Sequence, residues 1–321
     1  MPFKSSLLRS AGKFFEVFKN SNLSLRGSTQ STRVITVGLS VTGGNTSYTY
    51  GGKKIHVWTS PGPFVVTGGP ASIEYFVVAG GGSGGGDMGG AGGGGGVFTG
   101  SLDLSGPFST TVTVGDGGTA YGRGSATPDA GKGSNSVLNN PSTTITTVGG
   151  GFGQGDSDPD PDFAAESCGS GGGGFGQGHP NAGGPAPDPT QGNPGYTTAP
   201  PNKGGGGGGA GTGGPTTTPQ QDGGFGIAIP TTFRDPSNPY GGPNGPTQPS
   251  ITGNFYFAGG GAGGNPSNGN AWGGGGSVSE PPPAAPGTAN TGGGGAGGPG
   301  NGGSPGGAGG KGIVFVSYTP A

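Results

Sequence analysis

Residues 73–97 of the chain read IEYFVVAGGGSGGGDMGGAGGGGGV. Residues 73–79 are mostly β-branched and aromatic, which is typical of a short buried strand. Two glycine runs follow, at 80–86 and 89–96. A glycine chain can take the extended threefold polyproline II helix, and such helices, lacking Cβ atoms, approach closely enough to exchange backbone N–H···O=C bonds. We therefore expect a strand here, followed by laterally packed glycine rods.

The same alternation continues along the chain. Strand-like runs occur at 34–39, 54–59, 64–67, 97–104, 110–114 and 313–318. Further glycine runs lie at 149–155, 169–178, 203–214, 258–264, 273–276 and 292–310. Polar segments rich in Pro, Asp, Asn and Thr separate the glycine runs, and we expect them to form loops at the rod ends; they lie at 156–167, 179–202, 215–222, 230–250, 265–271 and 277–291.

These patterns predict a mainly β fold with an irregular, polyglycine II-like rod bundle and a short N-terminal α-helix. We expect an anchor helix at 1–20, an extended linker at 21–33 and a small β-module at 34–118. The rod bundle with its polar loops then occupies 119–311. A C-terminal strand within 312–321 closes the module by pairing near residues 73–79.

Composition excludes several classes of protein. Eighty-nine glycines and 32 prolines make up about 38 % of the 321 residues, and hydrophobic residues make up only 26 %. Runs such as 92–96 break the Gly-X-Y register that a collagen triple helix requires. A Rossmann domain, TIM barrel or helical bundle of this length needs a far larger aliphatic core.

Residues 2–19 carry the one helical period of the sequence. Apolar side chains recur at steps of three and four, and basic residues fall on the opposite side. We expect this helix to dock on a partner protein; the alternatives are packing on its own body and a membrane surface. The docking candidates are Phe3, Leu7, Leu8, Phe14, Phe15 and Phe18.

Charge divides unevenly along the chain. Residues 1–33 hold six basic groups and one acidic group, and the rest holds seven basic and fourteen acidic groups. The body has no basic stripe with interleaved aromatics, so we expect no nucleic-acid binding.

Cys168 is the single cysteine, which excludes an intrachain disulfide. No run reaches the roughly 18 apolar residues of a membrane span, and the N-terminus fits a secretory signal poorly but resembles a mitochondrial presequence.

No motif predicts catalysis or a cofactor. Matches to G-x-G-x-x-G are uninformative among 89 glycines, and each lacks the helix that a dinucleotide site requires. His56 and His179 show no arrangement with a nucleophile. Carboxylates at Asp156, Asp158, Asp160 and Asp162 alternate as Ca²⁺ ligands do, but Pro161 stands where an EF-hand loop needs glycine. We expect a solvated acidic loop and leave a bound cation open.

Several motifs together resemble the glycine-rich domain of bacteriophage tail-fibre and other virion proteins. The resemblance covers about residues 54–318 and depends on the order of its strand motifs: HVWT at 56–59, YFVVAGGG at 75–82, TVTVGDGG at 111–118, FYFAGGG at 255–261 and GGKGIVFVSY at 309–318. The head also resembles N-termini of structural proteins from marine phages, notably cyanophages. The resemblance implies a virion appendage. We expect it to be a homo-oligomer or to be present in many copies, and to attach to other virion proteins through its N-terminal segment.

The polar segments carry aromatic residues and an arginine, residue types that dominate binding surfaces. The candidates for contact with a host-cell receptor, protein or polysaccharide, are Phe163, Tyr196, Phe233, Arg234, Tyr240 and Trp272. The alternative is that these aromatics cap the rods, which we favour for Trp272. The expected function is a non-enzymatic tail-fibre or appendage adhesin. The alternatives are a capsid or neck decoration protein, a self-assembling fibre without receptor binding, and an ice- or carbohydrate-binding glycine-rich protein.

Overall fold

The computed structural model describes residues 38–122, 131–156, 168–176, 182–198, 203–211, 221–264, 269–278, 284–300 and 303–320. The chain divides into two compact units, Met1–Thr36 and Val37–Ala321. The predicted anchor helix, its docking residues and the linker at 21–33 lie outside the described residues. The second unit is described below.

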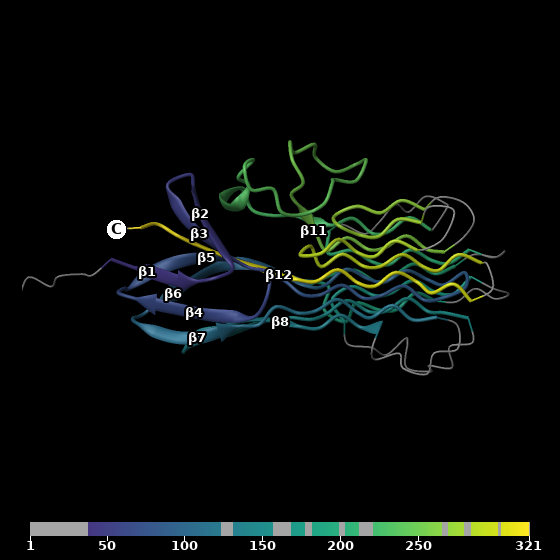
Figure 1. The fold of residues 1–321 in the computed structure, drawn as a ribbon, viewed down its shortest axis with the longest axis horizontal. Helices are drawn as coiled ribbons and strands as arrows, with labels where there is room; N and C mark the ends of the chain where they lie inside the picture. The colour runs from purple at the N-terminus through teal and green to yellow at the C-terminus, as the bar shows by residue number, and fades with distance from the viewer. Residues whose placement is uncertain are drawn as a thin grey trace, which may run out of the picture. The chain divides into compact units, whose positions relative to one another are not determined.

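The regular elements are almost all β-strands, as predicted (Figure 1). A single 3-10 turn, η1, spans Thr231–Phe233 among the described residues. None of the described segments forms an apolar helix of the length that spans a bilayer. The strands are β1 (Ser40–Gly43), β2 (Thr46–Tyr50), β3 (Lys53–Trp58), β4 (Gly62–Thr67), β5 (Ala71–Val78), β6 (Val97–Leu104), β7 (Phe108–Val112), β8 (Ser136–Asn139), β9 (Thr144–Thr147), β10 (Ile227–Ala228), β11 (Tyr256–Phe257) and β12 (Ile313–Tyr318).

An antiparallel sheet in the order β2-β3-β12-β5-β6 organises the unit. Its central strand, β12, pairs Val314 with Trp58 of β3 and with Val77 of β5. The predicted pairing of the C-terminal strand near residues 73–79 is therefore present. All six residues of β12 are buried, because both faces of this sheet are covered.

One face of this sheet packs against a second antiparallel sheet, β1-β4-β7. Alternating apolar residues of the two sheets form a shared core that includes Trp58, Phe64 and Val112. The Trp58 and Phe64 rings meet edge to face, with centroids 5.7 Å apart. One of the two main apolar clusters thus lies between the two sheets.

The other face of the five-stranded sheet is covered by residues 229–257. Phe315 of β12 is central to this second apolar cluster. Its ring lies 5.6 Å from that of Phe233, 5.5 Å from Tyr240 and 6.0 Å from Phe257, centroid to centroid. The segment at 230–250, expected as a loop at a rod end, is therefore part of the packing around the sheet.

Glycine rods extend from the strands, and residues 79–86 show how they pair. Every third N–H of this rod reaches the same neighbouring rod, which is the threefold repeat of polyproline II. The donor–acceptor pairs are Gly80–Ser134, Ser83–Gly131, Gly81–Gly310, Gly84–Gly307, Gly82–Gly93 and Gly85–Gly90, with N···O distances of 2.8 to 3.0 Å.

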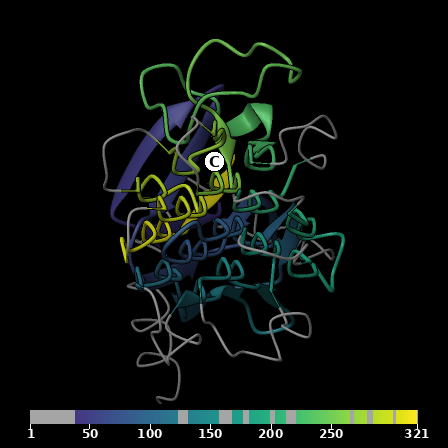
Figure 2. The same ribbon diagram turned by 90° about the vertical axis from the view of Figure 1, so that its right-hand side faces the viewer.

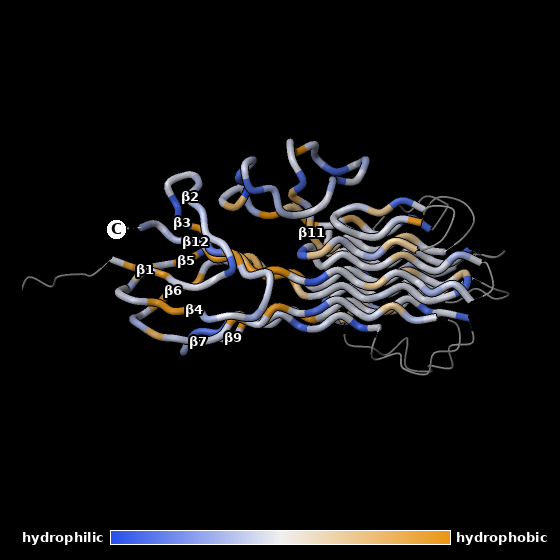
Figure 3. Tube along the Cα trace, in the orientation of Figure 1, coloured by the Kyte–Doolittle hydropathy of each residue, from blue (hydrophilic) through white to orange (hydrophobic). Residues whose placement is uncertain are grey.

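The carbonyl groups of the same rod accept from three further rods. The donors are Gly118, Gly150, Gly153, Gly295 and Gly298. Six rods thus surround residues 79–86, and Figure 2 views this lateral packing along the rods. Figure 3 shows that hydrophobic residues concentrate in and beside the strands, whereas the rods are close to neutral. Backbone hydrogen bonds take the place of an apolar core in the rods.

The close approach of the rods leaves no room for most side chains. A Cβ built on Gly82 would lie 2.0 Å from the Gly151 carbonyl oxygen, and one on Gly92 would lie 2.0 Å from that of Gly82. Methyl groups are nevertheless present at Ala91, Ala262 and Ala296, all fully buried.

Segments with proline also form rods, which corrects the expectation that residues 179–202 and 277–291 are loops throughout. Gly184 N–H donates to Gly172 O at 2.8 Å, and Ala296 N–H donates to Ala285 O at 3.0 Å. Proline suits an outer rod because its fixed φ matches polyproline II and its missing N–H is not needed on the solvent side. Pro194 and Pro286 are exposed in this way.

Strands and rods alternate along the chain. β8, β9, β10 and β11 lie inside the stretch 119–311 that the sequence assigns to the rods, and the rods at 79–96 lie inside the expected β-module. Each glycine run connects one strand to a later one. The β-sheets and the rods are therefore not separate domains, because the same stretches of chain pass through both.

Candidate functional site

The structure buries Phe233, one of the six receptor-contact candidates. Its side chain is 2 % exposed and packs on Phe315, so it is not available at the surface, and the expectation of a receptor contact is corrected. Tyr240 also packs on Phe315, but its hydroxyl lies 3.0 Å from the Thr46 hydroxyl at the surface. The apolar outer face of the five-stranded sheet explains both positions, because covering it with large side chains removes apolar surface from water.

Three other candidates lie elsewhere, and Phe163 is outside the described residues. Trp272 is partly buried against Phe225, with ring centroids 5.1 Å apart. Tyr196 is partly buried between rods, and burial, with a smaller contribution from Asp222, raises its pKa to about 12. Arg234 lines a pocket. The structure therefore does not bring the five described candidates together in one site.

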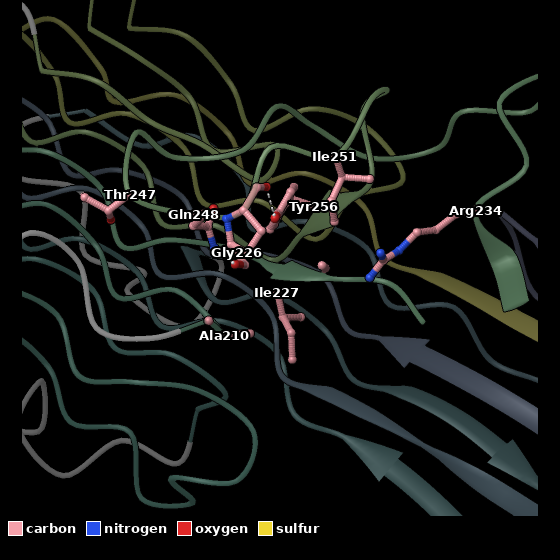
Figure 4. Close-up of a pocket in the computed structure, with 11 residues that line it drawn as sticks. Ala210, Gly226, Ile227, Arg234, Thr247, Gln248, Ile251 and Tyr256 are labelled. Carbon is pink, nitrogen blue, oxygen red and sulfur yellow. Dashed lines mark hydrogen bonds between the residues drawn. The ribbon is translucent and has the colours of Figure 1, made fainter. Parts of the chain in front are cut away.

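The pocket beside Arg234 is open and has a volume of about 650 Å³ (Figure 4). Three stretches far apart in the sequence form it, namely 210–211, 226–228 and 247–251, together with Arg234 and Tyr256. Most of its lining side chains are apolar, including Ile227, Pro249 and Ile251.

Hydrogen bonds fix the wall formed by residues 247–251. The Tyr256 hydroxyl donates to Pro249 O at 2.7 Å. The Gln248 side-chain amide donates to Gly226 O at 2.6 Å and accepts from Gly245 N–H at 2.8 Å. Both polar ends of Gln248 are thus engaged within the protein, and the wall is held in place without a ligand.

Arg234 supplies the charge of the pocket. Its Nε donates to Ile229 O at 2.6 Å, which directs the guanidinium toward β10 (Figure 4). Among the described residues no carboxylate forms an ion pair with it. Arg234 is the single charged residue among the described residues that line the pocket.

A second surface lies at the end of the rods away from the strands, here called the distal end. Segments far apart in the sequence are bonded to one another there. Asp87 N–H donates to Ser304 O at 3.1 Å, Gly176 N–H donates to Met88 O at 3.3 Å, and Gly264 N–H donates to Gly89 O at 2.8 Å. Gly122 and Gly303 also approach each other there.

The acidic series is described only at Asp156. Asp158, Asp160 and Asp162 lie outside the described residues, as does His179. Within the described part of the chain, no three His, Cys, Asp or Glu side chains are grouped so as to hold a metal ion.

His56 is buried in the core between the sheets. Its Nδ1 lies 2.8 Å from Gly43 O, and its ring stacks on Tyr318 at 6.0 Å. Burial lowers the pKa of the ring, the Gly43 carbonyl opposes this shift, and Lys54 adds to it. The side chain is therefore a packing element of this core.

Sequence reasoning missed the pocket. Its walls come from segments separated by up to 46 residues, and no local pattern links 210–211 to 247–251. Only the arginine in an aromatic- and proline-rich segment pointed to this region.

The comparisons with known proteins identify one family. A family model described as "Glycine-rich domain" matches residues 59–319. No curated protein matched the chain. The match covers most of the sequence, from the end of β3 through the rods to β12. The chain therefore belongs to the glycine-rich domain family.

Proposed function

We propose that this chain is a structural protein of a bacteriophage virion, an appendage adhesin such as a tail-fibre protein, and not an enzyme. The order of its strand and glycine motifs, which resembles that of phage glycine-rich domains, supports the assignment to a virion. In this proposal the N-terminal segment attaches to other virion proteins, and many copies present their distal ends to a receptor on the host surface.

The bonding at the distal end is the observation that carries the adhesin role. Backbone groups from residues 87–89, 176, 264 and 304 are tied together by hydrogen bonds of 2.8 to 3.3 Å. Positions from widely separated segments are thus held in fixed relation by the rods. Recognition surfaces are commonly built from segments that a rigid framework positions in this way.

The prolines of the outer rods count against the alternative of a self-assembling fibre. Lateral growth of a glycine bundle needs outward N–H donors on its outermost rods. Pro194 and Pro286 are exposed and have no N–H. Proline limits association at β-sheet edges for the same reason.

Two glycines provide a matched test of the adhesin role. A Cβ on Gly122, at the distal end, meets nothing nearer than Gly303 O at 3.7 Å, and one on Gly106, between β6 and β7, meets nothing within 4 Å. Both positions thus accept a Cβ, and thermal melting of the purified chain checks that Gly122→Trp and Gly106→Trp are folded. We expect virions carrying Gly122→Trp to assemble but adsorb poorly, and virions carrying Gly106→Trp to adsorb normally.

Mass spectrometry of purified virions provides the companion measurement. Absence of the chain from the particles contradicts the virion assignment. Presence of the chain with equal adsorption of both variants contradicts the adhesin role and favours a decoration protein.

A further inference from the structure

We propose that the pocket beside Arg234 binds a carboxylate-bearing saccharide, such as a uronic acid unit of a surface glycan. The pocket is distinct from the distal end, and this inference does not depend on the adhesin role. Its volume of about 650 Å³ falls within the range of small-molecule sites, roughly 300–1,000 Å³.

The charge of the pocket selects a monoanion. The Arg234 side chain is held through Nε, which leaves its two terminal nitrogens without a protein partner in the described chain. A guanidinium presents parallel N–H groups that match a carboxylate with two hydrogen bonds. No second cation lines the pocket within the described part of the chain, so a single carboxylate matches its charge better than a dianionic phosphate.

The free edge of β10 adds a hydrogen-bonding pair. Tyr256 of β11 exchanges both of its backbone hydrogen bonds with Gly242, at 2.7 and 3.2 Å. Ala228, which lies opposite Tyr256 in the register, is therefore in a non-hydrogen-bonded pair, and its N–H and C=O point away from β11. Ala228 lines the pocket and offers one donor and one acceptor to a hydroxyl or acetamido group.

The remaining walls suit the body of a sugar ring. Ile227, Pro249 and Ile251 present apolar surface to C–H groups, and the exposed hydroxyl of Thr247 stands at the rim. A peptide fits less well, because strand addition uses backbone groups along several residues, whereas β10 offers those of Ala228 alone. The pocket thus combines one cation, one backbone donor–acceptor pair and an apolar floor.

Ligand-observed NMR titration of the full chain tests the assignment, with glucuronate, glucose and glucose 6-phosphate as probes. We expect glucuronate to bind at least about tenfold more tightly than the other two, the discrimination typical of a hydrogen-bonded charge. Equal or tighter binding of glucose or glucose 6-phosphate would overturn the proposal, as would no binding of glucuronate. More effective competition by acetyl-trialanine, a peptide carboxylate, would also overturn it.

Two variants locate the binding. Arg234→Gln should weaken glucuronate binding at least about tenfold, with Arg234→Lys retaining part of the affinity. Thr247→Trp should block the pocket from its exposed rim without touching Arg234, and thermal melting checks that each variant is folded. Unchanged glucuronate affinity in folded Arg234→Gln and Thr247→Trp would place the ligand elsewhere and refute the assignment.

Discussion

Substitution of Gly92 by alanine tests how the rods are held together. The new Cβ would lie 2.0 Å from Gly82 O and 2.8 Å from Ser83 O. To reach an ordinary contact of 3.4 Å, the rods at 89–96 and 79–86 must separate locally by about 1.4 Å. The neighbouring Ala91 is fully buried, so a methyl group is not excluded from the rods as such, and the effect depends on the position.

The cost follows from the hydrogen bonds between these two rods. Three bonds link them, Gly82 N–H to Gly93 O, Gly85 N–H to Gly90 O and Ala79 N–H to Gly96 O, with N···O distances of 2.9 to 3.0 Å. A separation of about 1.4 Å breaks them, at roughly 0.5–1.5 kcal/mol each. The smaller entropy of the unfolded alanine chain offsets about 0.4–1 kcal/mol. We expect Gly92→Ala to lower the free energy of unfolding by roughly 0.5–4 kcal/mol.

Chemical denaturation of Gly92→Ala beside Gly122→Ala measures this loss. Gly122 has room for a Cβ, so its variant should match the original protein or exceed its stability by about 0.4–1 kcal/mol. Equal stability of the two variants would refute the reasoning, because it would mean that the lateral bonds between rods contribute little.

Three further predictions concern the cores and the buried cysteine. Phe315→Ala removes the ring around which the second apolar cluster packs and should cost about 3–5 kcal/mol of unfolding free energy, measured by denaturation. Because burial lowers the pKa of His56 in the folded state, the imidazole takes up a proton in the unfolded protein first as the pH falls. The unfolding free energy should therefore be full above about pH 6.5 and fall below it; thermal melts of His56→Phe should lose this part of the pH dependence. Cys168 is 4 % exposed and should react with a thiol reagent only after unfolding, as absorbance would show; fast labelling of the native protein would contradict its burial.

The strands and rods could be predicted where the residue types of a short stretch determine its structure. The runs at 97–104 and 313–318 coincide with β6 and β12, because apolar and β-branched residues in short runs leave few alternatives. The lateral bonding of glycine followed from backbone chemistry alone, since a buried N–H must find an acceptor.

Other elements escaped prediction because tertiary contacts decide them. β2 has the polar sequence TSYTY and is mostly exposed, so no apolar alternation marks it. The proline segments at 182–198 and 284–288 form rods only because neighbouring glycine rods supply donors and acceptors. Phe233 lies in a polar segment that predicts a surface loop, but the sheet face it covers exists only after β12 has paired.

Amide hydrogen exchange tests the central claim, that backbone bonds between glycine rods hold this fold together. We predict that the amides of Gly81, Gly82 and Gly93 exchange as slowly as those of β5 and β12, through global unfolding. Gly106 has no backbone hydrogen bond among the described contacts and should exchange rapidly. Exchange of the rod glycines at the rate of Gly106, with β5 and β12 still protected, would contradict the account.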